Sequence, residues 1–404
     1  MYNILMKKIL KKIFCCILIC MLFSIAISGS QHNKATVNYQ NIIDEESAYL
    51  YSLQLDNGCY PMTSYCYATD GYVQMNPYFA DFTALALLES GQTYLPSVKK
   101  YLDWHFLHLN SAEEDINNVA GTIYDYLEYV DSGSGDVKEE TVFIQDGKAF
   151  YDSTDSYAAL YLKVLYRYLQ VSGEESYLIA HKDQIDSLIG VLETTMVDGL
   201  STATPSFHTQ YLMDNAEVYD GLNDGISLYQ QLFPSDSIHI NEMEQMESQI
   251  QDKILTTMWH DGPNGYFDSM LEQQESGQYS APIFCWNTFY MDATSQLYLI
   301  TSGVLSPQSD TAAYLYRNFN RHWDNGTSLH SWTLMDIPDE YYWSKMAYCA
   351  ALMGDSGRVD QYLSTYETKV HSTEHAYPLY NADVAEVVRT AALCKAKLHS
   401  QPHS

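Results

Sequence analysis

The stretch SYAALYLKVLYRYL, residues 156–169, is apolar on most of its circumference when it is read as a helix. A helix that is apolar nearly all round is a buried helix. Five more stretches share this character: FADFTALALLESG (79–91), AEVYDGLNDGISLYQQL (216–232), NTFYMDATSQLYLI (287–300), YYWSKMAYCAALMG (341–354) and DVAEVVRTAALCKA (383–396). The stretches between them, such as HKDQIDSLIGVLETTM (181–196), carry a polar face and belong on the outside. The alternation predicts inner and outer helices in turn.

Apolar residues at i, i+3, i+4 and i+7 predict about twelve helices in all. Their ranges are 44–55, 78–90, 94–109, 155–171, 175–197, 215–232, 239–259, 287–302, 307–322, 341–353, 357–369 and 382–397. Six inner and six outer helices in strict alternation form an internal repeat, and its natural closure is an all-α (α/α)6 barrel. We therefore expect one barrel domain over residues 42–398, preceded by a polar linker over 31–41.

The N-terminal segment has the pattern of an export signal. Four lysines within residues 7–12 precede an apolar run over 13–27, and small residues follow at 28–30. This order is typical of a secretory signal peptide, here over residues 1–30. An uncleaved run would instead act as an anchor that tethers the protein to the membrane. Either reading predicts a protein that is secreted or held on the outer face of the cell membrane.

Composition limits the partners. The chain has 404 residues with 51 acidic and 21 basic side chains, a formal net charge of −30 that repels phosphate backbones and excludes nucleic acid. Its 36 tyrosines offer rings and hydroxyls that suit a polysaccharide or oligosaccharide, although most of them are expected at helix interfaces. We expect a monomer. No CxxC or HExxH spacing occurs in the mature chain, so we expect no metal site and no cofactor. Cys59 and Cys66 share a loop in which an oxidising compartment would allow them to pair.

The loops before the inner helices are long, whereas those after them are short. The long loops cover 55–77, 110–153, 199–213, 260–286, 323–340 and 371–381. In the predicted barrel they all open at one end, and each is followed by Asp, Asn or Glu at a helix start. Such residues are helix caps in the simplest interpretation. Six such starts beneath aromatic loops favour a binding cleft as well.

Glycosidic bond hydrolysis is the chemistry that fits such a cleft. It requires one protonated carboxylic acid and one ionised carboxylate. The catalytic candidates are Asp155, Asp214, Glu217 and Glu340. Polar and aromatic residues of the same loops and helix starts are the candidates for substrate binding: Tyr78, Asp81, Tyr151, Asp152, His208, Trp286, Trp332, Asp336 and Trp343.

The alternating helices, together with the segments YDSTDSYAALYL (151–162) and YLMDNAEVYDGLNDG (211–225), resemble the six-hairpin glycosidase superfamily. The S-T-D segment at 153–155 is similar to the A-T-D segment of family-8 glycoside hydrolases. This resemblance implies that Asp155 holds the sugar in the cleft. The family's general acid is a Glu in an S-E-G segment, but the corresponding place here reads MNPYFADF (75–82), without Glu. Either Asp81 replaces it, or the acid comes from another loop, or hydrolysis is weak or lost.

Two other functions remain open at this stage. The first is a non-catalytic glycan-binding or scaffold protein in exopolysaccharide assembly, which the missing Glu favours. The second is a polysaccharide lyase or epimerase, which would require basic residues around the cleft to neutralise a uronate. The long loops carry very few basic residues, such as Lys138 and Lys148, which argues against this second function.

Overall fold

The computed structural model describes residues 37–63, 71–131, 135–262, 264–324, 329–339, 341–375 and 379–400. The predicted signal peptide, Cys66 and Glu340 lie outside these ranges. Among the described residues, no helix combines the length and apolarity needed to cross a bilayer.

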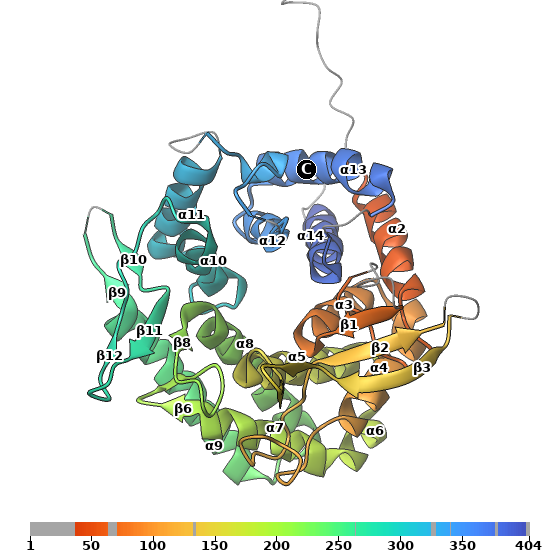
Figure 1. Cartoon of the computed structure of the whole chain (residues 1–404). Helices are drawn as coiled ribbons and strands as arrows, with labels where there is room; N and C mark the ends of the chain where they lie inside the picture. Colours follow the sequence, from red (N-terminus) through yellow and green to blue (C-terminus); the bar gives the residue numbers. More distant parts are fainter. Residues whose placement is uncertain are drawn as a thin grey trace, which may run out of the picture. The chain divides into compact units, whose positions relative to one another are not determined.

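Six helices form an inner ring (Figure 1). They are α3 (Pro77–Glu89), α5 (Thr154–Ser172), α8 (Leu212–Leu232), α10 (Thr294–Thr301), α12 (Lys345–Leu352) and α14 (Asn381–Ser400). Each packs against the next along the chain, and α14 packs against α3, which closes the ring. This confirms the (α/α)6 barrel and the predicted assignment of the buried helices.

The outer helices surround this ring. They are α2 (Tyr39–Ser52), α4 (Leu95–Leu107), the pair α6 (Glu175–Ala180) and α7 (Lys182–Thr195), α9 (Ser237–Lys253), α11 (Asp310–Trp323) and α13 (Ser356–Lys369). The sequence predicted a single helix over 175–197, whereas the structure divides it at His181. Helix α2 begins within the predicted linker, because the Asn38 side chain accepts a hydrogen bond from the Asn41 N–H and caps the helix there.

Two inner helices start later than their periodicity predicted. Before α10, residues Phe289–Ala293 form a π-helical turn (η3) in which Tyr290 is extended, with φ −100° and ψ 124°. Before α12, Trp343 has a φ of +52°, a left-handed conformation that an α-helix excludes. Both deviations turn aromatic side chains toward the same end of the barrel, as described below.

The long loops contain short antiparallel strands that the helical pattern did not predict. One sheet has the order β1 (Tyr72–Met75), β2 (Tyr126–Val130), β3 (Val137–Val142). A second has the order β12 (Tyr279–Ser280), β11 (Met270–Gln273), β8 (Gln210–Tyr211). Two-residue strands form three hairpins: β4 (Ile144–Gln145) with β5 (Lys148–Ala149), β6 (Met196–Val197) with β7 (Leu200–Ser201), and β9 (Trp259–His260) with β10 (Tyr266–Phe267). Three further short helical turns are η1 (Gln92–Tyr94), η4 (Trp332–Leu334) and η5 (His371–Thr373), and a π-helical turn, η2 (Ile254–Met258), extends α9.

Small residues bring the inner helices close together. Gly221 of α8 lies against the backbone of Ala159 in α5, in a contact that leaves no room for a side chain. Pro77 at the first position of α3 and the Asn76 side chain, which accepts from the Phe79 N–H, fix where the first inner helix begins. All six inner helices have their first turns at the same end of the barrel, where residues from each of them line one cavity.

Candidate active site

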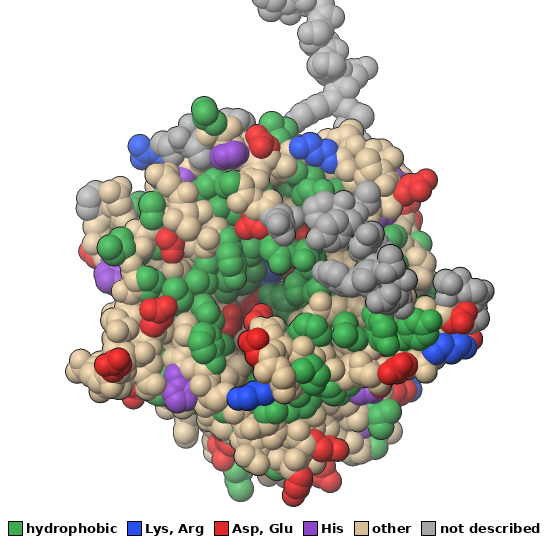
Figure 2. Space-filling view, viewed as in Figure 1, with side chains coloured by type: hydrophobic (Ala, Val, Ile, Leu, Met, Phe, Trp, Pro, Cys, Tyr) green, Lys and Arg blue, Asp and Glu red, His purple; other side chains and the backbone are tan. Residues whose placement is uncertain are grey.

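A cavity of about 520 Å³ opens where the inner helices begin. Figure 2 shows it as a hollow at the centre of this face, with acidic side chains inside and hydrophobic side chains around it. Every inner helix contributes to its wall: Tyr78 from α3, Ser156 from α5, Glu217 from α8, Tyr298 from α10, Lys345 from α12, and Asp383 from α14.

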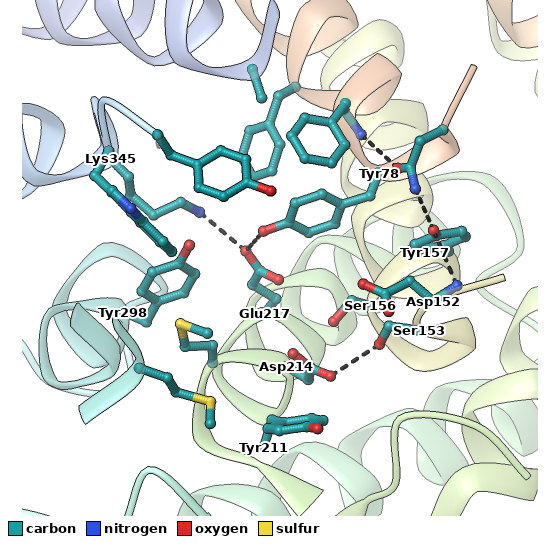
Figure 3. Close-up of a pocket in the computed structure, with 18 of the residues that line it drawn as sticks. Tyr78, Asp152, Ser153, Ser156, Tyr157, Tyr211, Asp214, Glu217, Tyr298 and Lys345 are labelled. Carbon is teal, nitrogen blue, oxygen red and sulfur yellow. Dashed lines mark hydrogen bonds and ion pairs between the residues drawn. The ribbon is translucent and has the colours of Figure 1, made fainter. Parts of the chain in front are cut away.

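Glu217 lies at the centre of this site (Figure 3). Its Oε1 accepts a hydrogen bond of 2.8 Å from the Tyr78 hydroxyl and lies 3.1 Å from the Lys345 Nζ. The Glu217 side chain is 8% exposed and that of Lys345 is 11% exposed. The ammonium and the hydroxyl donor together hold the buried Glu217 carboxylate in one orientation.

Asp214 stands one turn before Glu217 on the same helix, a spacing that places the two side chains on one face. Its Oδ2 accepts a 3.0 Å hydrogen bond from the Ser153 hydroxyl. Burial, followed by the negative charges of Asp155 and Glu217, raises the pKa of Asp214 well above its ordinary value, against the lowering effect of the Ser153 hydrogen bond. The surroundings of Asp214 therefore favour its protonated form.

Three further carboxyl groups line the cavity, from Asp152, Asp383 and Glu386. Burial raises the pKa of Asp152, and it raises that of Asp383 to about 6 although the Ser344 N–H donates to the Asp383 carboxylate. Lys345 is the single basic residue among the described lining residues, and Glu217 and Glu386 share its charge. The cavity is thus unsuited to an anionic ligand.

Aromatic rings form one wall of the cavity. Tyr290 and Trp343 have ring centroids 4.9 Å apart, and Tyr341 continues the group at 6.1 Å from Trp343. All three line the cavity, and Tyr290 is 52% exposed. Exposed aromatic faces beside a set of carboxyl groups provide the stacking surface and polar contacts that a sugar ring uses.

The structure brings five of the candidate residues from the sequence together around the cavity: Tyr78, Asp152, Asp214, Glu217 and Trp343. Asp155, in contrast, is fully buried and does not line it. The Asp155 carboxylate accepts from the hydroxyls of Ser153 at 2.6 Å and Ser201 at 2.5 Å and from the Ser156 N–H at 2.8 Å. Ser153 also donates to Asp214, so Asp155 lies directly behind the site.

The remaining candidates that the structure describes do not line the cavity. Asp81 is fully buried and accepts a 2.8 Å hydrogen bond from Tyr101 of α4, so it faces the outer layer instead of replacing a catalytic Glu. The Tyr151 hydroxyl accepts from the Asn117 side chain, and the Trp332 indole donates to Asn320 in the core. The other three residues also lie outside the lining. Trp286 is buried beside His322, and His208 forms a hydrogen bond with Gln273 of β11. Asp336 is exposed near His330.

Sequence reasoning missed several lining residues, above all Lys345. A lone lysine in the otherwise apolar run 341–354 was a usable signal, because a buried ammonium requires a carboxylate partner. Tyr298 and Glu386 lie inside their runs and carry no comparable mark in the sequence.

No family model matches this sequence, and no curated protein matches it. Solved structures do. A glycosidase variant in complex with glucose has a TM-score of 0.59 at 12% identity, covering 92% of this chain and 100% of that one. An α-amylase from Clostridium perfringens has a TM-score of 0.56 at 9% identity, covering 88% and 97%. An inactive α-1,6-mannanase variant from Salegentibacter sp. HEL1_6, in complex with α-1,6-mannotriose, has a TM-score of 0.51 at 9% identity, covering 89% and 99%.

At 12% identity or less, these likenesses concern the fold. The chain has an (α/α)6 fold, as its sequence pattern predicted, and the solved structures that share this fold are named as a glycosidase, an α-amylase and an α-1,6-mannanase.

Proposed function

We propose that the protein is a glycoside hydrolase that acts on a neutral polysaccharide or oligosaccharide. The observation that carries the proposal is the pair Asp214 and Glu217, one helical turn apart in the cavity wall. The surroundings of Asp214 favour its neutral form, whereas Glu217 is ion-paired with Lys345. Glycosidic hydrolysis requires one carboxyl group that donates a proton and a second that acts as a base or nucleophile, and this pair offers a candidate for each role.

In this mechanism Asp214 donates its proton to the glycosidic oxygen as the bond from that oxygen to the anomeric carbon breaks. The negative charge of Glu217 stabilises the developing oxocarbenium ion, and its carboxylate accepts a proton from the water molecule whose oxygen bonds to the anomeric carbon. Tyr78 and Lys345 orient the Glu217 carboxylate. The aromatic wall of Tyr290, Tyr341 and Trp343 stacks against the sugar rings.

The carboxyl-rich lining favours a neutral sugar and argues against a uronate substrate, and so against a lyase or epimerase. With Lys345 engaged by Glu217 and Glu386, no lining cation among the described residues is left to neutralise a uronate. The N-terminal basic and apolar segment supports action outside the cytoplasm, on the outer face of the membrane or after secretion.

The test is an assay of reducing ends released from a panel of neutral polysaccharides. Asp214→Asn and Glu217→Gln should each lower the rate by about 10²–10⁴-fold, the range for loss of an acid–base group. Asp183→Asn, which changes an exposed carboxylate on α7, is the matched control and should leave the rate unchanged. Release that persists in both site variants would refute the assigned pair.

A binding protein without catalysis is the second candidate, because α3 offers Tyr78 to the cavity and no carboxyl group. It predicts that oligosaccharides from the panel bind and protect the protein against thermal unfolding while no reducing ends form. That outcome would replace the hydrolase proposal.

A further inference from the structure

A second polar cluster lies at the seam where the first helix of the barrel meets its last outer helix. Glu46 of α2 is 2% exposed. One of its carboxylate oxygens lies 2.8 Å from the His371 Nδ1, and the other lies 2.6 Å from the His375 Nε2. The Tyr366 hydroxyl of α13 donates to the same carboxylate at 2.8 Å. Figure 1 shows α2 and α13 side by side here.

The cluster lacks a fixed positive charge. Among the described residues, the ion pairs of Glu46 are with His371 and His375, and none is with Lys or Arg. A second group of similar composition, Asp186, Asp236 and His239, differs in this respect. There the Lys182 ammonium lies 2.8 Å from both aspartates and already supplies the cation. A buried carboxylate requires a positively charged partner, and a metal ion held by the same side chains would supply one.

The backbone is bent so that His375 reaches Glu46. Glu374 and His375 have φ values of +54° and +56°, a left-handed conformation that costs free energy in residues other than glycine. His375 is nevertheless buried, and its ring stacks on Tyr49 with centroids 3.7 Å apart. Two consecutive residues in this conformation, holding an imidazole against a carboxylate, indicate a site under constraint.

We propose that Glu46, His371 and His375 bind a divalent transition metal ion, with zinc as the ion that best fits them. Their ligand atoms all lie within 4.8 Å of one another, so a modest outward shift of the side chains would accommodate a central ion. Two imidazoles and one carboxylate suit zinc and related transition metals, whereas calcium and magnesium prefer oxygen ligands alone.

The surroundings complete the coordination pattern. With His371 Nδ1 on the metal, its Nε2 lies 3.5 Å from the Glu45 carboxylate, which can orient the ring as an outer-shell partner. Tyr366 does the same for Glu46. None of these residues lines the cavity. The ion would have a structural role, because it would link α2 to the chain segment between α13 and α14.

The experiment uses the full chain, treated with a chelator and desalted, with zinc chloride as the probe. Calorimetric titration should give about one zinc ion per chain, and zinc should raise Tm, since a ligand that binds the folded state stabilises it. Calcium chloride at the same concentration should leave Tm unchanged. Cobalt(II) should give the visible absorption bands of a bound ion, independently of stability.

His371→Gln is the main variant because that side chain is 33% exposed and its loss should not prevent folding. It should weaken zinc binding at least tenfold and abolish the zinc-dependent rise in Tm, as should Glu46→Gln. Asp236→Asn, in the cluster that Lys182 already neutralises, should bind zinc like the parent chain. Equal zinc affinity in the parent chain and His371→Gln, or no binding by the parent chain, would overturn the proposal and leave an imidazole–carboxylate cluster.

Discussion

The Nζ of Lys345 on α12 lies 3.1 Å from Oε1 of Glu217 on α8, which joins two inner helices that α10 separates. The same ammonium lies 3.6 Å from Glu386 on α14 and 4.4 Å from the ring centroid of Tyr298 on α10. It also lies 4.4 Å from the ring centroid of Phe82 on α3, so one buried cation contacts side chains from four other inner helices. The site is held together across the barrel and not only along each helix.

Replacing Lys345 by Met should therefore destabilise the fold strongly. The change leaves the Glu217 and Glu386 carboxylates without that countercharge, and breaking a buried pair in this way costs about 3–5 kcal/mol. Urea denaturation would measure the loss as a lower midpoint at an unchanged slope. The double variant Lys345→Met with Glu217→Gln should recover part of the loss, because it removes one of the stranded charges. A loss below about 1 kcal/mol would show that the pair behaves as a solvated surface pair.

Replacing Asp155 by Asn should shift the pH dependence of activity without removing a group that touches substrate. The charge of Asp155 is the largest electrostatic cause of the raised pKa of Asp214, after burial. Without that charge the pKa of Asp214 falls, so the protonated acid is lost at lower pH. The alkaline limb of kcat/KM should move to lower pH, whereas Asp183→Asn should leave it in place. An unmoved limb in Asp155→Asn would mean that Asp214 is not the acid.

The fold could be predicted from the sequence because helical periodicity depends on residues that are close together in the chain. The run 156–169 shows a buried helix by its own composition, and the same holds for the other five inner helices. Helix starts at 289–294 and 343–345 were not readable, since the extended Tyr290 and the left-handed Trp343 depend on loop packing. The short strands leave no helical pattern, and some of them, such as β8 and β11, pair segments that are distant in sequence.

The residues of the site could be predicted only in part, and Asp155 illustrates the reason. An Asp in an S-T-D helix start can be either a helix cap or a cleft residue. In the structure the Asp155 carboxylate accepts hydrogen bonds from Ser153 and from Ser201, which lies 46 residues further on. Asp214 and Glu217 line the cavity because α8 presents that face inward. The cluster of Glu46 and His371 joins residues 325 positions apart, and the sequence holds no spacing that would bring them together.

Asp125 should make stability fall as pH rises. It is 1% exposed, it accepts from Asn76 and Tyr157 behind the cavity wall, and burial raises its pKa from 3.8 to about 7. Because the folded state binds the proton more tightly, the stabilisation is complete below the unfolded pKa and disappears as pH rises to about 7. At 1.36 kcal/mol per pH unit this corresponds to about 4 kcal/mol at most.

Urea denaturation of the parent chain and Asp125→Asn at about pH 4 and about pH 8 would isolate this contribution. The difference in unfolding free energy between the two proteins should move in favour of the variant as pH rises. A difference that stays constant over this range would mean that Asp125 titrates alike in the folded and unfolded states.

Substituting Ala for Gly should lower the stability of the protein at one position and raise it at another. A Cβ on Gly221 of α8 would overlap the carbonyl oxygen of Ala159 in α5, so Gly221→Ala must push these two inner helices apart. Overpacking of this kind costs about 1–3 kcal/mol. A Cβ on Gly190 of α7 would meet no atom within 4 Å, so Gly190→Ala should stabilise the outer helix by about 0.4–1 kcal/mol by restricting the unfolded chain. Because α8 carries Asp214 and Glu217, Gly221→Ala should also lower activity, while Gly190→Ala should not. Denaturation would measure the unfolding free energy of both variants, and reducing-end assays would measure their activity. If both substitutions changed the unfolding free energy by the same amount in the same direction, the close packing of α5 against α8 would be contradicted.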